Sequence, residues 1–183
     1  MPHTAARATR EMALEWLGEV MDPEVPVVSV VDLGIVRDVQ WQADAVNSAH
    51  DGHWTVTVTP TYSGCPATEV IAASIRDALR ARGMGEVKVH TQLSPAWTTD
   101  WMTPKGREAL RDYGIAPPVH RAPGAGNSQV IDITALMPHR TTVPCPRCSS
   151  RKTRLLSQFG STACKALYQC SDCLEPFDYF KPH

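Results

Sequence analysis

The 183-residue sequence lacks any apolar run that approaches the roughly 18 residues a membrane span needs. Its first residues, MPHTAARATREMALEW, also lack the apolar core of a secretion signal. We therefore expect a cytoplasmic protein that has no membrane role.

Common catalytic motifs are absent as well. The sequence contains no G-x-S-x-G nucleophile motif, no H-E-x-x-H zinc motif and no phosphate-binding loop. An independent hydrolase or transferase is therefore not expected.

The chain has little net charge, −1 overall, but the charge is unevenly distributed. The segment from Arg140 to the end carries a net +4, and the rest carries −5. A basic segment can bind nucleic acid, but this excess is small and aromatic residues are not interleaved with the basic ones. A solvated basic face is the simpler interpretation, so nucleic acid is not an expected partner.

The clearest structural pattern begins at Trp54. Trp54, Val56 and Val58 alternate with threonines, which is the period of a half-buried strand. From Ala67 the apolar spacing becomes helical. The residues expected on one helical face are Val70, Ile71, Ser74, Ile75, Ala78 and Leu79.

Flanking patterns predict a helix at residues 8–20, a strand at 35–41 and a third strand at 87–93. The order α-β-β-α-β predicts a small α+β domain. Thr103 is expected to cap a further short helix that Gly114 ends. Three acids between the first helix and the first strand could cap, coordinate or face solvent, and capping or solvation is favoured. These acids are Asp22, Glu24 and Asp32.

Cys65 lies between the predicted central strand and its helix. Pro66 suits the first helical position, so Cys65 is expected at or next to the helix N-cap. Unpaired N–H groups and the positive end of the helix dipole there favour a thiolate, as in a nucleophile or a soft-metal ligand. The alternative is a small half-buried cysteine that only packs the turn.

Two Cys-x-x-Cys pairs dominate the C-terminal segment, Cys145/Cys148 and Cys170/Cys173. This spacing turns both sulfurs of a pair toward one ion, and two pairs complete a tetrahedral site. With short strands expected at 153–159 and 177–180, the segment predicts a zinc ribbon. Zinc is the expected metal, although four thiolates also bind iron or an iron–sulfur cluster.

Cys164 is surplus to a four-ligand site. It is either a small structural residue or a functional thiol that could pair with Cys65 to hold iron or a cluster transiently. The proline- and glycine-rich stretch APPVHRAPGAGN has the composition of a linker. We therefore predict a first domain at residues 1–115, a linker at 116–142 and the ribbon at 143–183.

Two motifs in the first domain resemble a known family. DPEVPVVSVVDLGIVRDV followed by VTPTYSGCPATEVI is similar to the SufT-like domain of iron–sulfur cluster assembly factors. The resemblance spans Leu14 to Leu93 and implies an α+β fold. It also implies that Cys65 is the reactive thiol and that Asp22 and Thr61 support it.

The rest of the chain extends the resemblance. SPAWTTDWMTPKGREALRDYGIAPP, FGSTACKALYQC and the CPRC and CSDC pairs look like the PaaD family, which is encoded with the multicomponent phenylacetyl-CoA epoxidase. This implies an accessory factor that helps to assemble or insert an iron–sulfur cluster or iron in an epoxidase component. Implied partners are the epoxidase reductase or diiron hydroxylase and the cluster-assembly machinery. A homodimer stays open, and the alternative role is a structural or electron-transfer subunit of the oxygenase.

Overall fold

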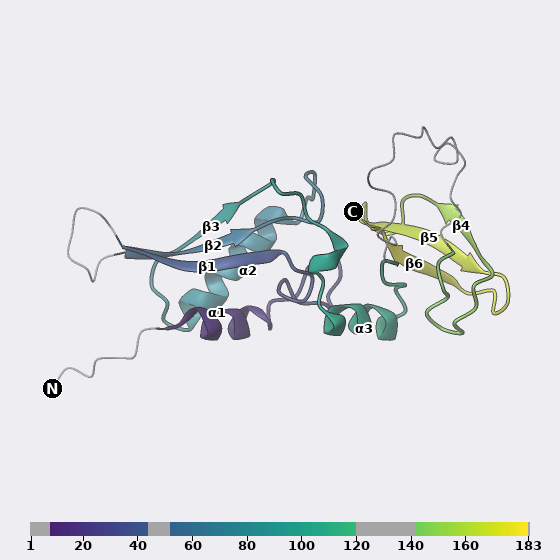
Figure 1. The fold of residues 1–183 in the computed structure, drawn as a ribbon, viewed down its shortest axis with the longest axis horizontal. Coiled ribbons are helices and arrows are strands. Elements are labelled where there is room, and N and C mark those ends of the chain that lie inside the picture. The colour runs from purple at the N-terminus through teal and green to yellow at the C-terminus, as the bar shows by residue number, and fades with distance from the viewer. Residues whose placement is uncertain (1–7, 44–51, 120–141, 183) are drawn as a thin grey trace, which may run out of the picture. The chain divides into compact units, whose positions relative to one another are not determined.

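The computed structural model describes residues 8–43, 52–119 and 142–182, which fall into two compact units that divide between Leu110 and Arg111. In the first unit, β2 pairs antiparallel with β1 and parallel with β3 (Figure 1). The predicted α+β class and the order α-β-β-α-β are confirmed. The elements are α1 (Arg10–Leu17), β1 (Val36–Ala43), β2 (Gly52–Val58), α2 (Thr68–Ala81) and β3 (Val87–Thr91).

One face of this sheet carries the core. Trp54, Val56 and Val58 of β2 are at most 6% exposed, and the threonines between them are half-buried, as the alternation predicts. Helix α1 contacts both β1 and α2, and α2 contacts β3, so the two helices cover the same face (Figure 1). Helix α2 buries Ile71, Ala72, Ile75 and Leu79. Val70, which the helical spacing places on this apolar face, is 53% exposed.

Helix α3 (Pro104–Tyr113) begins and ends where the sequence predicts. The Thr103 hydroxyl accepts the N–H of Gly106 at 3.0 Å, and Gly114 has a positive φ of 95°. A 3₁₀ turn, η1 (Thr99–Trp101), precedes the helix. Trp97 is 3% exposed and donates its indole N–H to the carbonyl of Leu33, so it is a core residue.

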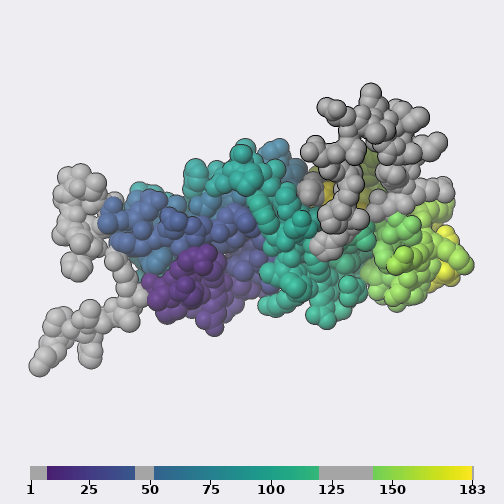
Figure 2. Space-filling view, viewed as in Figure 1, coloured from purple at the N-terminus to yellow at the C-terminus, as the bar shows by residue number. Residues whose placement is uncertain are grey.

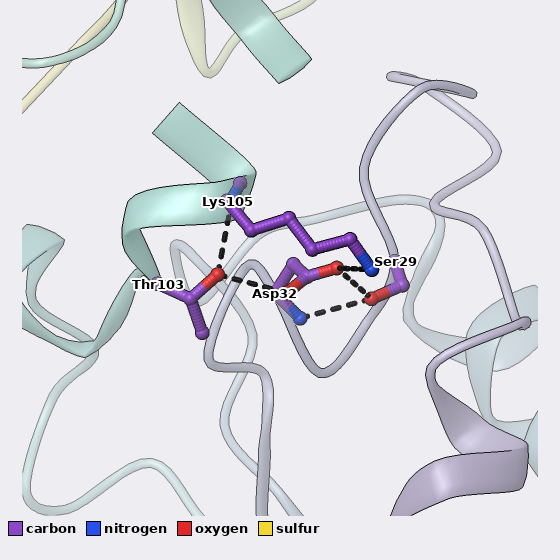
Figure 3. A network of polar contacts seen from close by, with 5 residues as sticks. Ser29, Asp32, Thr103 and Lys105 are labelled. Atoms are coloured by element: carbon purple, nitrogen blue, oxygen red, sulfur yellow. Dashed lines mark hydrogen bonds and ion pairs between the residues drawn. The ribbon is translucent and has the colours of Figure 1, made fainter. Parts of the chain in front are cut away.

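Asp32 fixes the start of α3 to the loop before β1 (Figure 3). Its carboxylate accepts the hydroxyls of Ser29 and Thr103, each at 2.8 Å, and forms a 3.4 Å ion pair with Lys105. Its carbonyl also accepts the N–H of Thr103 at 2.9 Å. Asp32 therefore does not cap the helix itself but holds the capping residue, Thr103, which lies 71 residues further along the chain.

The second unit is a three-stranded antiparallel sheet of order β4-β5-β6. Its strands are β4 (Thr153–Ser157), β5 (Lys165–Cys170) and β6 (Pro176–Phe180). The sequence predicts the two outer strands but not β5. Ala116 forms a parallel bridge with Tyr179 of β6, and most of the remaining predicted linker lies outside the described residues. The domain boundaries at 115 and 142 stay predictions.

Within the described ranges, no helix combines the length and the apolar character that a membrane crossing requires.

Candidate metal centre and thiol site

The four paired cysteines converge at one end of the ribbon sheet. Their sulfurs all lie within 4.8 Å of one another, with Cys145 3.7 Å from Cys173 and Cys148 3.6 Å from Cys170. A tetrahedron with zinc–sulfur bonds of about 2.3 Å has edges of about 3.8 Å. The observed spacing therefore fits a single tetrahedral ion.

Each Cys-x-x-Cys pair lies on a backbone turn of the same kind, which is called a knuckle here. The N–H of Cys145 donates to the carbonyl of Ser150 at 2.9 Å, and that of Cys170 donates to the carbonyl of Glu175 at 3.0 Å. Cys145 and Cys170 are buried, whereas Cys148 and Cys173 are exposed. The ion would therefore lie between the small ribbon core and the surface.

Crowding of the sulfurs separates the pKa values of the thiols. Hydrogen bonds from the backbone N–H groups of Cys173 and Asp172 lower the pKa of Cys170 to about 6. At Cys148 the Ser150 N–H also acts to lower the pKa, but desolvation and the other three sulfurs raise it to about 12. Four thiolates cannot coexist here without a cation, which is what a metal ion supplies.

Cys65 lies in the loop between β2 and α2, as the sequence predicts. Its N–H donates to the carbonyl of Tyr62 at 3.2 Å, and its carbonyl accepts the Thr68 hydroxyl at 2.8 Å. The helix, however, begins at Thr68 with Ala67 as its N-cap, so Pro66 is not the first helical residue. Cys65 therefore stands two residues before the cap rather than at or next to it.

Of the two alternatives for Cys65, the structure favours the half-buried cysteine, because the pKa of its thiol is raised. Burial is the largest effect and raises the pKa of this half-buried thiol, and the carboxylates of Glu24 and Asp22 raise it further. The N–H of Ala67 and the hydroxyl of Thr68 act in the opposite direction but do not prevail. The reactive role of Cys65 stays a prediction, and the helix end does not create a ready thiolate.

Asp22 stabilises the loop that contains the two carboxylates acting on this thiol. It is 6% exposed, and its Oδ1 atom accepts the N–H groups of Glu24 at 2.8 Å and Val25 at 2.9 Å. Asp22 therefore caps a turn while its charge raises the pKa of Cys65. Thr61 is 7% exposed in the loop that leads to Cys65, and its supporting role stays a prediction.

Glu24 is a site residue that the family resemblance does not single out. Its carboxylate acts on Cys65 in the same direction as that of Asp22, because both raise the pKa of the thiol. A signal exists in the sequence, since Glu24 lies in the same Asp-Pro-Glu turn as Asp22.

Cys164 is 3% exposed and belongs to the second unit, where its sulfur lies 3.0 Å from the Thr162 hydroxyl. Its burial suits the structural interpretation. Cys65 belongs to the first unit, so their predicted pairing stays a prediction.

Comparison with known proteins decides the family. Residues 10–90 match the family described as iron–sulfur cluster assembly protein, and residues 132–181 match the PaaD zinc beta ribbon domain. The chain is 51% identical over 165 residues to a putative 1,2-phenylacetyl-CoA epoxidase subunit of Escherichia coli K12, covering 90% of this chain and 88% of that protein. The chain belongs to the PaaD family.

Further relatives of this PaaD family member match between 55% and 58% of the chain. An iron–sulfur protein maturation auxiliary factor of Porphyromonas gingivalis is 35% identical, covering 58% of this chain and 92% of the relative. A second such factor, of Bacillus subtilis, is 34% identical, covering 56% of this chain and 94% of the relative. A crystal structure of a domain of unknown function from Bacillus anthracis is 29% identical, with a TM-score of 0.46, covering 55% of this chain and 90% of that one.

Proposed function

We propose that this protein is a maturation factor for the phenylacetyl-CoA epoxidase. In this role it helps to deliver iron or an iron–sulfur cluster to an epoxidase component, the reductase or the diiron hydroxylase. One observation carries the proposal: a single chain joins an iron–sulfur assembly domain to a ribbon characteristic of the PaaD family.

Cys65 would hold the cargo. It is the one cysteine in the sequence of the first unit, it is partly accessible, and the carboxylates of Asp22 and Glu24 act on it electrostatically. Carboxylates that disfavour a free thiolate favour a bound cation beside it.

The ribbon would have a structural ion, zinc, bound by Cys145, Cys148, Cys170 and Cys173. The sulfur spacing fits a closed four-coordinate site that leaves no position for substrate. Its ion therefore stabilises the ribbon fold and does not take part in cargo transfer.

The test compares loading of the epoxidase components. Cys65→Ser should leave the fold intact and strongly reduce the iron and acid-labile sulfide of the reductase, or the iron of the hydroxylase, when each is produced with the variant. Cys164→Ser is compared alongside, because normal loading with it would assign the cargo to Cys65 alone, whereas a loss would support the predicted pairing of the two thiols. Full loading with Cys65→Ser would reject this function.

The same loading test distinguishes the maturation role from the alternative role as an oxygenase subunit. A structural or electron-transfer subunit predicts fully loaded components with either variant and stable co-purification with the hydroxylase. The Escherichia coli relative is described as a subunit, which makes this alternative worth the comparison.

A further inference from the structure

The segment that follows α3 pairs with the ribbon sheet. The N–H of Ala116 donates to the carbonyl of Asp178 at 2.8 Å, and the carbonyl of Ala116 accepts the N–H of Phe180 at 2.9 Å. These two bonds form the parallel bridge to Tyr179, on the edge of β6 that β5 leaves open. Figure 2 shows residues 115–119, called the edge segment here, in teal beside the green and yellow ribbon.

The edge segment also belongs to the apolar core of the ribbon. Ala116 is 1% exposed and lies within this core, and Val119 packs against it. The N–H of Val119 donates to the hydroxyl of Tyr179 at 3.5 Å. The same core contains Cys145 and Cys170, the buried cysteine of each knuckle. One small core therefore includes both the edge segment and half of the predicted metal ligands.

The first knuckle lies next to the same stretch of chain. A Cβ atom added at Gly114, which follows α3, would lie 3.9 Å from the guanidinium of Arg147. Arg147 and Pro146 separate the ligands Cys145 and Cys148, and they line one side of a depression of about 390 Å³. Residues 111–114 line the other side, and all of these residues belong to the second unit. The loop that carries two of the four sulfurs therefore borders the end of α3.

The ribbon is small enough to depend on its ion for folding. Its described core has only seven buried residues, and segments of this size have little folding energy apart from metal binding. Four sulfurs within 4.8 Å of one another also need a cation if all are to be thiolates. Loss of the ion should therefore unfold β6 and remove the edge on which Ala116 is bound.

We propose that the ribbon ion controls the edge segment, which is bound while the four cysteines hold the ion and released when the ion is lost. Release matters because α3 begins in the first unit and ends in the second. Its start stays attached through Thr103 to Asp32, whereas its end loses its attachment. The ion is thus a conformational switch for the end of α3, whether or not Cys65 carries a cargo.

Thermodynamic linkage makes this switch measurable at the metal site. If the ion favours binding of the edge segment, then binding of the edge segment must raise the affinity for the ion by the same factor. Couplings of this kind are typically about 5- to 150-fold. A substitution at Ala116, which is not a ligand, should therefore weaken binding of the ion.

Ala116→Asp tests the linkage in the full chain. A carboxylate is costly to bury, so the edge segment should leave the ribbon. Ala163→Asp is the matched control, because Ala163 is an exposed alanine in the turn between β4 and β5. Zinc affinity is measured by competition with a chromophoric chelator under reducing conditions.

We expect Ala116→Asp to bind zinc about tenfold more weakly than the parent or worse, and Ala163→Asp to bind it as the parent does. Equal affinity of Ala116→Asp and the parent, or an equal loss in the control, would overturn the switch.

Hydrogen exchange in the parent follows the release directly and needs no variant. The amide of Ala116 is monitored by NMR with zinc bound and after its removal by a chelator, and the amide of Ile75, buried in α2, is the internal reference. We expect exchange at Ala116 to become about tenfold faster or more without zinc, with no change at Ile75. Protection of Ala116 that persists without zinc, its absence with zinc bound, or equal acceleration at Ile75 would contradict the proposal.

Discussion

At the scale of single residues, the surroundings of Cys65 raise the pKa of its thiol and do not activate it as a nucleophile. A nucleophilic cysteine needs a lowered pKa, whereas burial and the carboxylates of Glu24 and Asp22 raise the pKa of this one. A positively charged cargo would reverse that effect, because it stabilises the thiolate and neutralises the carboxylates.

Glu24→Gln tests the electrostatic part of this description. Removing the carboxylate should lower the pKa of Cys65, so its alkylation by iodoacetamide should accelerate about two- to threefold at a pH below that pKa. For both proteins the rate should rise with pH, and the curve of the variant should lie at lower pH. The rate is measured at Cys65 by peptide mass spectrometry.

Glu86→Gln is the control for this experiment, because Glu86 is an exposed acid of the same unit that pairs with Lys88 at 3.6 Å. Its alkylation rate should equal that of the parent. A Glu24→Gln rate that matches this control would show that the carboxylate does not act on the thiol.

The position of Cys65 could be predicted from the sequence, but its pKa could not. A change of period from two to 3.6 residues locates the loop. The pKa depends on burial and on the turn at Asp22–Glu24, some 40 residues earlier in the chain. Only tertiary structure brings these groups together.

At the scale of elements, α3 is held by one close contact as well as by its cap. Gly106 is buried, and a Cβ atom added there would lie 2.7 Å from the carbonyl oxygen of Asp32. That oxygen belongs to backbone that already bonds Thr103, so it cannot move away freely. Glycine at 106 therefore allows α3 to approach the loop before β1.

Gly106→Ala should destabilise the first unit by about 1–3 kcal/mol, because the added methyl group overpacks this contact. Helix propensity alone predicts the opposite sign, a gain of about 1 kcal/mol. Urea unfolding followed by tryptophan fluorescence measures the change, since all five tryptophans lie before Leu110.

The control is Glu108→Ala, an exposed position of the same helix, where only a small change is expected. Stabilisation by Gly106→Ala would mean that propensity prevails and that the contact with Asp32 is loose.

Local signals explain which elements could be predicted. Thr103, Pro104 and Gly114 mark both ends of α3 within its own sequence. Strand β5 is harder to predict, because it lies within the spacer between the two cysteine pairs. Its residues Ala166, Tyr168 and Cys170 do alternate toward the ribbon core. The attachment of α3 to Asp32 has no local signal at all.

At the scale of the whole molecule, two units carry two kinds of cysteine site. The ribbon site is closed, with four sulfurs for one ion, and the small core around it includes Cys145 and Cys170. The site in the first unit has one thiol beside acids and is partly open. The four-cysteine site can be predicted from the sequence because each knuckle is formed by residues close together in the chain. The metal that each site prefers cannot be predicted in this way.

The most direct measurement is therefore zinc, iron and acid-labile sulfide per chain, on protein purified without oxygen, for the parent and Cys65→Ser. We predict one zinc per chain in both proteins, with iron, and sulfide if the cargo is a cluster, in the parent alone. Iron that stays in Cys65→Ser would contradict the account, because the cargo would then be bound by the ribbon.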